Sequence, residues 1–266
     1  MKLRRRAAIL PVLYVLGGLL AGAALAGAAG AAKGPIGWWK LNECSRLPAA
    51  DSSGNCNNGA IGSAVTVDVP GARGTAYKFD GSANSYVDVP FGSGTLAPST
   101  THITVSAWIN PSSFACGQCA VVSNEPTPGE NRWGYGLRVS DNGITLQWCW
   151  GTEGGPGNCA YGAFAFPLNT WTNIVGTYDG ATLNEYVNGV FVTSQLGVFP
   201  ALNTLRDLFI GRLPSGNLLW IGGIDDVRVY NRVLSAEQIE QIAHPEGEDK
   251  KRDQNDQSGH HENGQH

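Results

Sequence analysis

The stretch WTNIVGTYDGATLNEYVNGV, residues 171–190, contains two short segments rich in β-branched and aromatic residues, each ending at a turn signal. The signals are Asp179-Gly180 and Asn188-Gly189, dipeptides that supply the positive φ angles needed by two-residue hairpin turns. A third such pair, Asn142-Gly143, lies closer to the N-terminus. These residues predict antiparallel strands joined by hairpins.

The same pattern extends in both directions, from Gly34 to about Ala243, as short β-rich segments bounded by Gly, Pro, Asn or Asp. The segments are residues 37–42, 76–81, 85–90, 103–110, 134–140, 144–150, 171–180, 183–189, 190–195, 207–212 and 224–231. Eleven or more strands with no internal linker predict one all-β domain over residues 33–244, built as a two-sheet antiparallel sandwich, rather than two domains.

One helix is expected, at the C-terminal end of this domain. Ser235 and Gln238 have the spacing of a capping box, and Ile239 and Ile242 give a short apolar face. A sandwich of this size closes by bringing its last strand beside its first.

Composition and charge limit the classes of function that the chain can have. The 266 residues carry a formal net charge of −4, and the first six residues hold four of the 18 basic side chains but none of the 22 acidic ones. The rest of the chain is therefore distinctly acidic, which argues against nucleic acid as a partner because phosphates need a basic surface. The 36 glycines and single methionine fit a turn-rich chain.

The two ends of the chain differ from the middle. Residues 1–32 have a basic start, an apolar stretch and the small-residue sequence Ala24-Leu25-Ala26, which predicts a signal peptide or, as the rival, an N-terminal membrane anchor. Either one places the domain outside the cytoplasm, as a secreted, periplasmic or cell-surface protein. Residues 245–266 contain no aliphatic or aromatic side chain and predict a disordered polar tail.

Six cysteines fall into three local pairs, in agreement with an oxidising compartment. Proximity in the sequence favours neighbour pairing into three disulfides. A zinc site is disfavoured because one C-x-x-C has no second one and no histidine at ligand spacing, and a redox C-x-x-C would need a βαβ setting. The expected pairs are Cys44–Cys56, Cys116–Cys119 and Cys149–Cys159.

Two adjacent acids, Asp225 and Asp226, precede the last strand-like segment. Alternation directs Val227 and Val229 to the core, with Asp226, Arg228 and Tyr230 on the other face. Asp225 shares the core-facing parity, so its carboxylate needs a partner. A catalytic pair is disfavoured because neighbouring strand residues point to opposite faces. A hard-cation site and a solvated strand end remain.

At this point the residues resemble a known family. Successive signatures look like those of LamG-like jelly-roll domains, which belong to the concanavalin A-like lectin/glucanase superfamily. The resemblance implies a jelly-roll sandwich, a fold that hosts sugar binders, adhesins, protein-binding modules and glycan-cleaving enzymes. The signatures are GWWKLNE, ADSSGNCNNGAI, AYKFDGSANSYVDVP, ITVSAWINP, WTNIVGTYDGATLNEYVNGV, LFIGR and GGIDDVRVYNRVLSAEQI.

The loop DSSGNCNN, residues 51–58, offers oxygen-bearing side chains beside a glycine, the flexible array that calcium prefers. The family resemblance likewise implies a structural calcium ion between this loop and the final strand. The alternative is an Asx-turn at Asp51 and aspartates that accept backbone N–H bonds. The predicted calcium ligands are Asp51, Asn55, Asn58, Asp225 and Asp226.

Aromatic residues decide whether a sugar platform exists. Same-parity runs at 133–139 and 144–150 mix aromatic with aliphatic residues and are typical of sandwich core. Trp133 and Trp150 lie at strand ends beside loops, where an exposed indole could stack on a pyranose. The residues expected to add hydrogen bonds to the sugar are Arg132, Glu153, Asn158 and Tyr161.

Catalysis is disfavoured. A retaining glycosidase needs two carboxyl groups about 5–5.5 Å apart, and the nearest candidates, Glu125 and Glu130, lie in EPTPGE, whose prolines and glycine indicate a loop. The sequence therefore predicts a non-catalytic recognition module for a carbohydrate or glycoconjugate. The alternatives are a protein-binding adhesion or matrix module, and a glycan-active hydrolase or lyase with an unrecognised motif.

Overall fold

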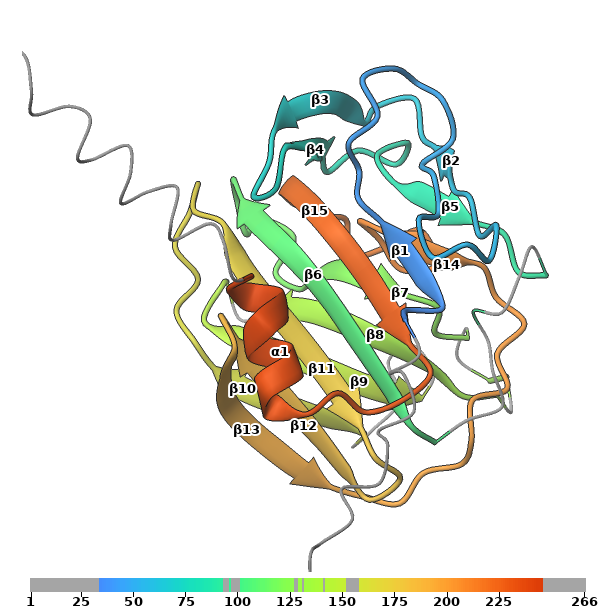
Figure 1. Ribbon diagram of the computed structural model, residues 1–266, viewed down its shortest axis with the longest axis vertical. Helices are drawn as coiled ribbons and strands as arrows, with labels where there is room; N and C mark the ends of the chain where they lie inside the picture. The colour runs from blue at the N-terminus through green and yellow to red at the C-terminus, as the bar shows by residue number, and fades with distance from the viewer. Residues whose placement is uncertain are drawn as a thin grey trace, which may run out of the picture. The chain divides into compact units, whose positions relative to one another are not determined.

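The computed structural model describes residues 34–92, 96, 101–126, 129–130, 132–140, 142–151 and 158–245. Within these residues it forms two antiparallel sheets, stacked as a sandwich, and one short helix, α1 (Ala236–Ala243) (Figure 1). The predicted N-terminal segment 1–32, residues 246–266 of the predicted tail and Glu153 lie outside the described residues. The predicted all-β sandwich fold is confirmed.

The first sheet has eight strands in the order β13-β12-β11-β6-β15-β4-β3, and β1 also pairs with β15. The first and last strands of the domain are therefore neighbours, as expected. The strands are β1 (Gly37–Trp39), β3 (Thr66–Pro70), β4 (Thr75–Asp80), β6 (Ile103–Pro111), β11 (Thr172–Tyr178), β12 (Thr182–Val187), β13 (Val190–Leu196) and β15 (Ile221–Tyr230).

The second sheet has seven strands in the order β10-β9-β8-β7-β14-β5-β2. Consecutive strands β7 to β10 form a meander, whereas β14 enters from far along the chain to pair with both β7 and β5. The strands are β2 (Ala60–Ile61), β5 (Val87–Val89), β7 (Cys119–Ser123), β8 (Gly134–Ser140), β9 (Thr145–Gly151), β10 (Cys159–Ala163) and β14 (Leu208–Ile210).

The core lies between the inner faces of the two sheets. Alternation places Tyr135, Leu137 and Val139 of β8 there, all fully buried, and the same rule directs their neighbours outward. Large aromatic side chains fill much of this layer, including Trp148 and Trp220. Each buries enough apolar surface to contribute about 2–3 kcal/mol to stability.

Two of the three predicted turn dipeptides take the expected positive φ, but only Asn188-Gly189 forms a two-residue turn, because four residues connect β8 to β9. Asn142-Gly143 and Asn188-Gly189 take positive φ at both residues, between 49° and 88°. Asp179 does not, and three residues rather than two connect β11 to β12. The reason is local: the Asp179 carboxylate accepts hydrogen bonds from the backbone N–H groups of Ala181 and Thr182, which closes an Asx-type turn instead.

α1 has the predicted capping box between Ser235 and Gln238. Ile239 and Ile242 pack with Val175 of β11 and Tyr230 of β15 in a second apolar cluster. The helix lies across the outer face of the eight-stranded sheet (Figure 1). The helix therefore covers part of this outer face, and Tyr230, which packs beneath it, is only 6% exposed.

Two of the three predicted disulfides are formed, Cys116–Cys119 and Cys149–Cys159. The third prediction is wrong in this structure, because Cys44 and Cys56 are free and exposed. Cys56 adopts a left-handed conformation with a φ of 61°, in a loop whose hydrogen bonds are made to the Asp51 carboxylate. In the part of the chain described, no helix combines the length and apolar character needed to cross a membrane.

Candidate functional site

A β-bulge in β15 decides where the two adjacent acids point. Asp225 pairs with Trp108 and Arg228 pairs with Ser106, so one residue of β6 faces two of β15, and Asp226 takes a φ of 47°. The bulge reverses the alternation: Ile224 and Val227 both reach the core. The prediction for Val227 and Val229 is therefore confirmed, but the core-facing parity expected of Asp225 is wrong.

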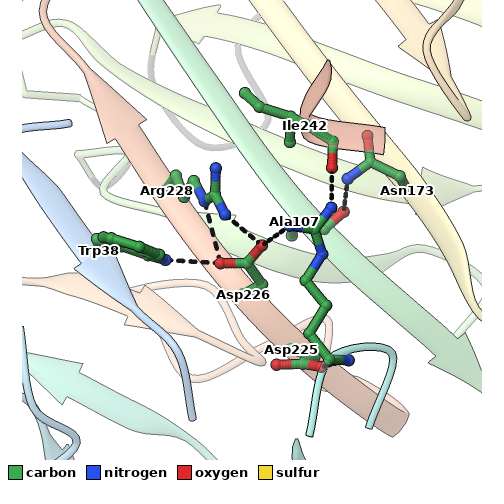
Figure 2. Close-up of polar contacts among 8 residues, drawn as sticks. Trp38, Ala107, Asn173, Asp225, Asp226, Arg228 and Ile242 are labelled. Carbon is green, nitrogen blue, oxygen red and sulfur yellow. Dashed lines mark hydrogen bonds and ion pairs between the residues drawn. The ribbon is translucent and has the colours of Figure 1, made fainter. Parts of the chain in front are cut away.

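Asp226 forms an ion-pair cluster on the outer face of the eight-stranded sheet (Figure 2). Its Oδ1 accepts hydrogen bonds from Trp38 Nε1 at 2.6 Å and Arg228 Nε at 3.0 Å, and its Oδ2 accepts one from Arg228 Nη2 at 2.8 Å. Arg73 Nη1 lies 3.5 Å from the same Oδ2. Two guanidinium groups therefore neutralise this carboxylate.

Asp225 is fully buried and turned away from Asp226 (Figure 2). Its Oδ2 accepts a hydrogen bond from the backbone N–H of Arg73 at 2.8 Å, while Oδ1 has no hydrogen-bond partner. Burial raises the pKa of Asp225 to about 7, and the nearby Asp226 charge acts in the same direction. The two carboxyl groups have separate partners, the backbone N–H of Arg73 for Asp225 and guanidinium groups for Asp226.

Asp51 organises the loop of residues 51–58. Its carboxylate accepts hydrogen bonds from the backbone N–H groups of Trp38, Ser53 and Asn57 and from Ser53 Oγ, at 2.8–2.9 Å. Burial alone would raise the pKa of Asp51, but these bonds outweigh it and leave the pKa below its ordinary value. Asn58 Oδ1 accepts a hydrogen bond from the Asp51 N–H, which ties the two ends of the loop together.

The five predicted calcium ligands therefore fall into two groups: Asp51, Asn55 and Asn58 in the loop, and Asp225 and Asp226 on β15. Asn55 belongs to the first, since its Nδ2 donates to Ile36 O at 3.1 Å and to Ser53 Oγ. Trp38 joins the groups directly, with its backbone N–H on Asp51 and its indole on Asp226. Among the described residues, no cluster of three or more His, Cys, Asp or Glu could hold a metal ion. Calcium stays a prediction from the sequence.

The outer face of the seven-stranded sheet carries a different set of polar residues. Strand register places Arg138, Gln147 and Tyr161 side by side on β8, β9 and β10. Tyr161 is 58% exposed, whereas Arg138 and Gln147 are almost fully buried. Tyr161, predicted as a ligand residue, is thus a solvent-facing aromatic ring at the edge of this row.

Arg138 forms a buried ion pair with Glu125, which follows β7. The same Glu125 Oε2 accepts a hydrogen bond from Ser123 Oγ at 3.1 Å. Gly136 makes room for the pair, because a Cβ atom at this position would lie 2.3 Å from Glu125 Oε2. The predicted loop conformation at Glu125 is correct, and its carboxylate is engaged by a guanidinium group.

An open cleft of about 750 Å³ lies where the chain enters β8 and β14, lined by Glu130, Arg132, Asn203, Leu205 and Arg206. Asn203 holds its two walls together. Its Oδ1 accepts from the backbone N–H of Trp133 at 2.5 Å, and its own N–H donates back to Trp133 O at 3.0 Å. Arg132 Nη1 adds a bond to Asn203 O at 3.1 Å. These residues are about 70 positions apart in the sequence.

Charged groups dominate the cleft. The Glu130 carboxylate contacts Arg206 directly and Arg132 Nε at 3.9 Å. Both guanidinium side chains keep a substantial exposed fraction, 37% for Arg132 and 40% for Arg206. Leu205 is 53% exposed and adds an apolar surface. The cleft therefore offers hydrogen-bond donors, one acceptor group and an apolar patch to a polar ligand.

Trp133 follows Arg132 in sequence but does not line the cleft; its indole is partly buried and stacked on Phe199 with ring centroids 6.2 Å apart. Asn158 and Trp133 both approach Gly151, where an added Cβ would lie 3.3 Å and 3.8 Å from their side chains. Three of the predicted ligand residues, Arg132, Trp133 and Asn158, are thus brought to one end of the second sheet.

Trp150 does not join them, and the expected exposure of its indole is wrong. It is fully buried, donates from Nε1 to Pro200 O at 2.9 Å, and its ring centroid lies 4.4 Å from that of Tyr178. The reason is parity: Trp150 points to the same side of β9 as Leu146 and Trp148, into the core.

Sequence reasoning missed Asn203, Leu205 and Arg206 altogether and treated Glu130 only as a rejected catalytic candidate. No local pattern marks the 203–206 segment, because its role depends on β14 entering the second sheet beside β7. Arg138 and Gln147 could have been found, since both hold outward positions in otherwise apolar strands.

The family model Laminin_G_3, described as the concanavalin A-like lectin/glucanases superfamily, matches residues 80–240. No curated protein matches the sequence.

Solved structures with the same fold are distant in sequence. Domain 4 of AbnA, a GH43 extracellular arabinanase from Geobacillus stearothermophilus in complex with arabinotriose, is 18% identical with a TM-score of 0.60, covering 79% of this chain and 98% of that one. The botulinum neurotoxin type G receptor binding domain is 16% identical (TM-score 0.59), and Trypanosoma rangeli sialidase 16% (TM-score 0.60). Each match covers 79% of this chain, but it spans only 51% of the toxin domain and 32% of the sialidase. At these low identities, the similarities show a shared fold and nothing more.

Proposed function

Because the chain belongs to the concanavalin A-like lectin/glucanases superfamily, we propose that its sandwich is a non-catalytic recognition module that binds a carbohydrate or glycoconjugate. The observation that carries the proposal is the open polar cleft lined by Glu130, Arg132, Asn203, Leu205 and Arg206. The complex of the AbnA domain with arabinotriose supports the ligand class, since that domain has the same fold over nearly its whole length.

The chemistry of the cleft suits a sugar. Sugar rings present hydroxyl groups at their edges and apolar C–H groups on their faces, so they need planar polar side chains together with an apolar or aromatic surface. The guanidinium and amide groups supply the polar side chains, and Leu205 supplies the apolar surface. A volume of about 750 Å³ lies within the usual range for ligand sites.

Binding without cleavage is part of the proposal. A glycosidase of the common type needs an acid and a second carboxylate on either side of the scissile bond. In the described residues, the cleft is lined by one carboxylate, Glu130, and guanidinium groups contact both Glu130 and the nearby Glu125. We also propose an extracytoplasmic location, which the two disulfides support.

Isothermal titration calorimetry with a panel of oligosaccharides, arabinotriose included, tests the proposal. We expect Leu205→Ala and Asn203→Ala to weaken binding at least about tenfold, because each removes a side chain that lines the cleft. The matched control is Phe191→Ala, which removes an exposed ring from β13 in the other sheet. Unchanged affinity in both cleft variants, or release of reducing ends from a bound oligosaccharide, would refute the proposal.

A second candidate, a protein-binding adhesion module, is favoured by the edge strand β13. It ends the eight-stranded sheet, and residues 190–198 carry no charge. Val190, Leu196 and Val198 are each more than two-thirds exposed. Edge strands of this kind offer unpaired backbone groups to a partner. A protein ligand whose binding is lost in Leu196→Lys but kept in Asn203→Ala would favour this candidate.

A further inference from the structure

We infer that the preferred ligand of the cleft is an anionic saccharide, one that carries a carboxylate or a sulfate ester. This inference rests on the proposed function and names the chemical class of its ligand. It starts from the charges that line the cleft among the described residues: two guanidinium groups, Arg132 and Arg206, and one carboxylate, Glu130. A neutral sugar has no need of this excess of positive charge.

The single carboxylate does not cancel the excess positive charge that a bound ligand would meet. Glu130 Oε1 is bonded to Arg206, and Glu130 Oε2 lies 3.9 Å from Arg132 Nε. Its negative charge is therefore directed at the two arginines. The distance of 3.9 Å is too long for a hydrogen bond, so the Arg132 guanidinium keeps donor capacity, and 37% of its side chain is exposed.

Asn203 adds to the donor character. Its Oδ1 accepts from the Trp133 N–H, which leaves the Nδ2 amide hydrogens as the donors of this side chain. The cleft thus presents guanidinium and amide N–H groups, an arrangement suited to a ligand rich in acceptor oxygens. Guanidinium groups bind carboxylate and sulfate oxygens through paired N–H donors, more strongly than they bind hydroxyl groups.

Acidic groups near the cleft do not cancel this preference. Asp207 follows Arg206 in sequence, but its Oδ1 accepts from the Phe91 N–H at 2.5 Å, and Asp207 does not line the cleft. The chain as a whole is acidic, with a net charge of −4. A cleft with more positive than negative groups is therefore a local exception, and local exceptions in charge are characteristic of binding sites.

The test compares matched saccharides on the full chain by calorimetry: trigalacturonate, its methyl ester, and a sulfated galactose trisaccharide beside the neutral parent. We expect the acidic sugars to bind at least about tenfold more tightly than their neutral counterparts, and this difference to shrink as sodium chloride rises from 50 mM to 500 mM. Comparison of the carboxylate and sulfate arms identifies which group is preferred.

Arg132→Gln should remove most of the preference for acidic sugars, because it lowers the affinity for acidic sugars far more than the affinity for neutral ones. Lys78→Gln is the control, since it removes one exposed positive charge from β4 of the other sheet. Equal affinity of the wild-type protein for acidic and neutral sugars would overturn this inference and leave the proposed function standing. Failure to bind any saccharide would overturn both.

Discussion

Replacement of Glu185 by Gln should stabilise the protein at neutral pH. Glu185 lies on β12, points into the sandwich and is fully buried, with no hydrogen bond of normal geometry to either carboxyl oxygen. Burial raises its pKa to about 8, although the backbone at Trp148 and Gly162 lowers it in part. The folded protein therefore holds Glu185 protonated at pH 7, whereas the unfolded chain ionises it.

The magnitude follows from the two pKa values. The ordinary value is 4.5 and the folded value is about 8, and each pKa unit corresponds to about 1.4 kcal/mol. Because the folded pKa is the higher one, the favourable contribution of this group is complete below about pH 4.5 and is lost as the pH rises towards 8. Between pH 4 and pH 7 the loss is about 3 kcal/mol. This is an upper limit, because local opening can hydrate an ionised carboxylate.

Glutamine has the same shape as glutamic acid but does not titrate, so the variant lacks this loss. Urea unfolding at pH 4, 5, 6, 7 and 8 should give similar stabilities at pH 4 and an advantage for Glu185→Gln that grows to about 3 kcal/mol at pH 7. Asp225, whose pKa is also raised, affects both proteins equally. Glu240→Gln, at an exposed helix position, is the control and should show no such trend. Parallel stability profiles for the Glu185 variant and the wild type would refute the reasoning.

Three other experiments, two with substitutions and one a thiol titration, give further tests. Gly136→Ala should lower the free energy of unfolding by about 2 kcal/mol or more, because the new methyl group collides with Glu125; an unchanged Tm would contradict the packing of this pair. Trp38→Phe should cost about 2 kcal/mol through loss of a bond to a buried carboxylate. We expect its Tm loss to exceed that caused by EDTA in the wild type, whereas a larger effect of EDTA would establish the calcium ion predicted from the sequence. Under non-reducing conditions, thiol titration of the unfolded protein should detect two free thiols, Cys44 and Cys56; a count near zero would instead support their disulfide.

Much of the fold could be read locally. The capping box at Ser235, the turns at Asn142 and Asn188 and the alternation in β8 each depend on residues only a few positions apart. Asp179 shows that even a local turn signal can mislead. The Asp-Gly dipeptide predicts a two-residue turn, but the Asp179 carboxylate accepts backbone hydrogen bonds that close a different turn. Alternation also separates core from surface correctly where a strand is regular, and it would have placed Trp150 in the core had parity been preferred to its position beside a loop.

The sequence by itself determined the strands, most of the turns, the capped helix and the sandwich, because periodicity and turn chemistry act between near neighbours in the chain. Only the tertiary structure decided the bulge at Asp226, the link from Trp38 to Asp51 and Asp226, and the cleft that joins Arg132 to Asn203. These depend on which strands become neighbours, above all β1 beside β15 and β14 beside β7. Such pairings join segments 70 or more residues apart, and no local pattern in either segment specifies its partner.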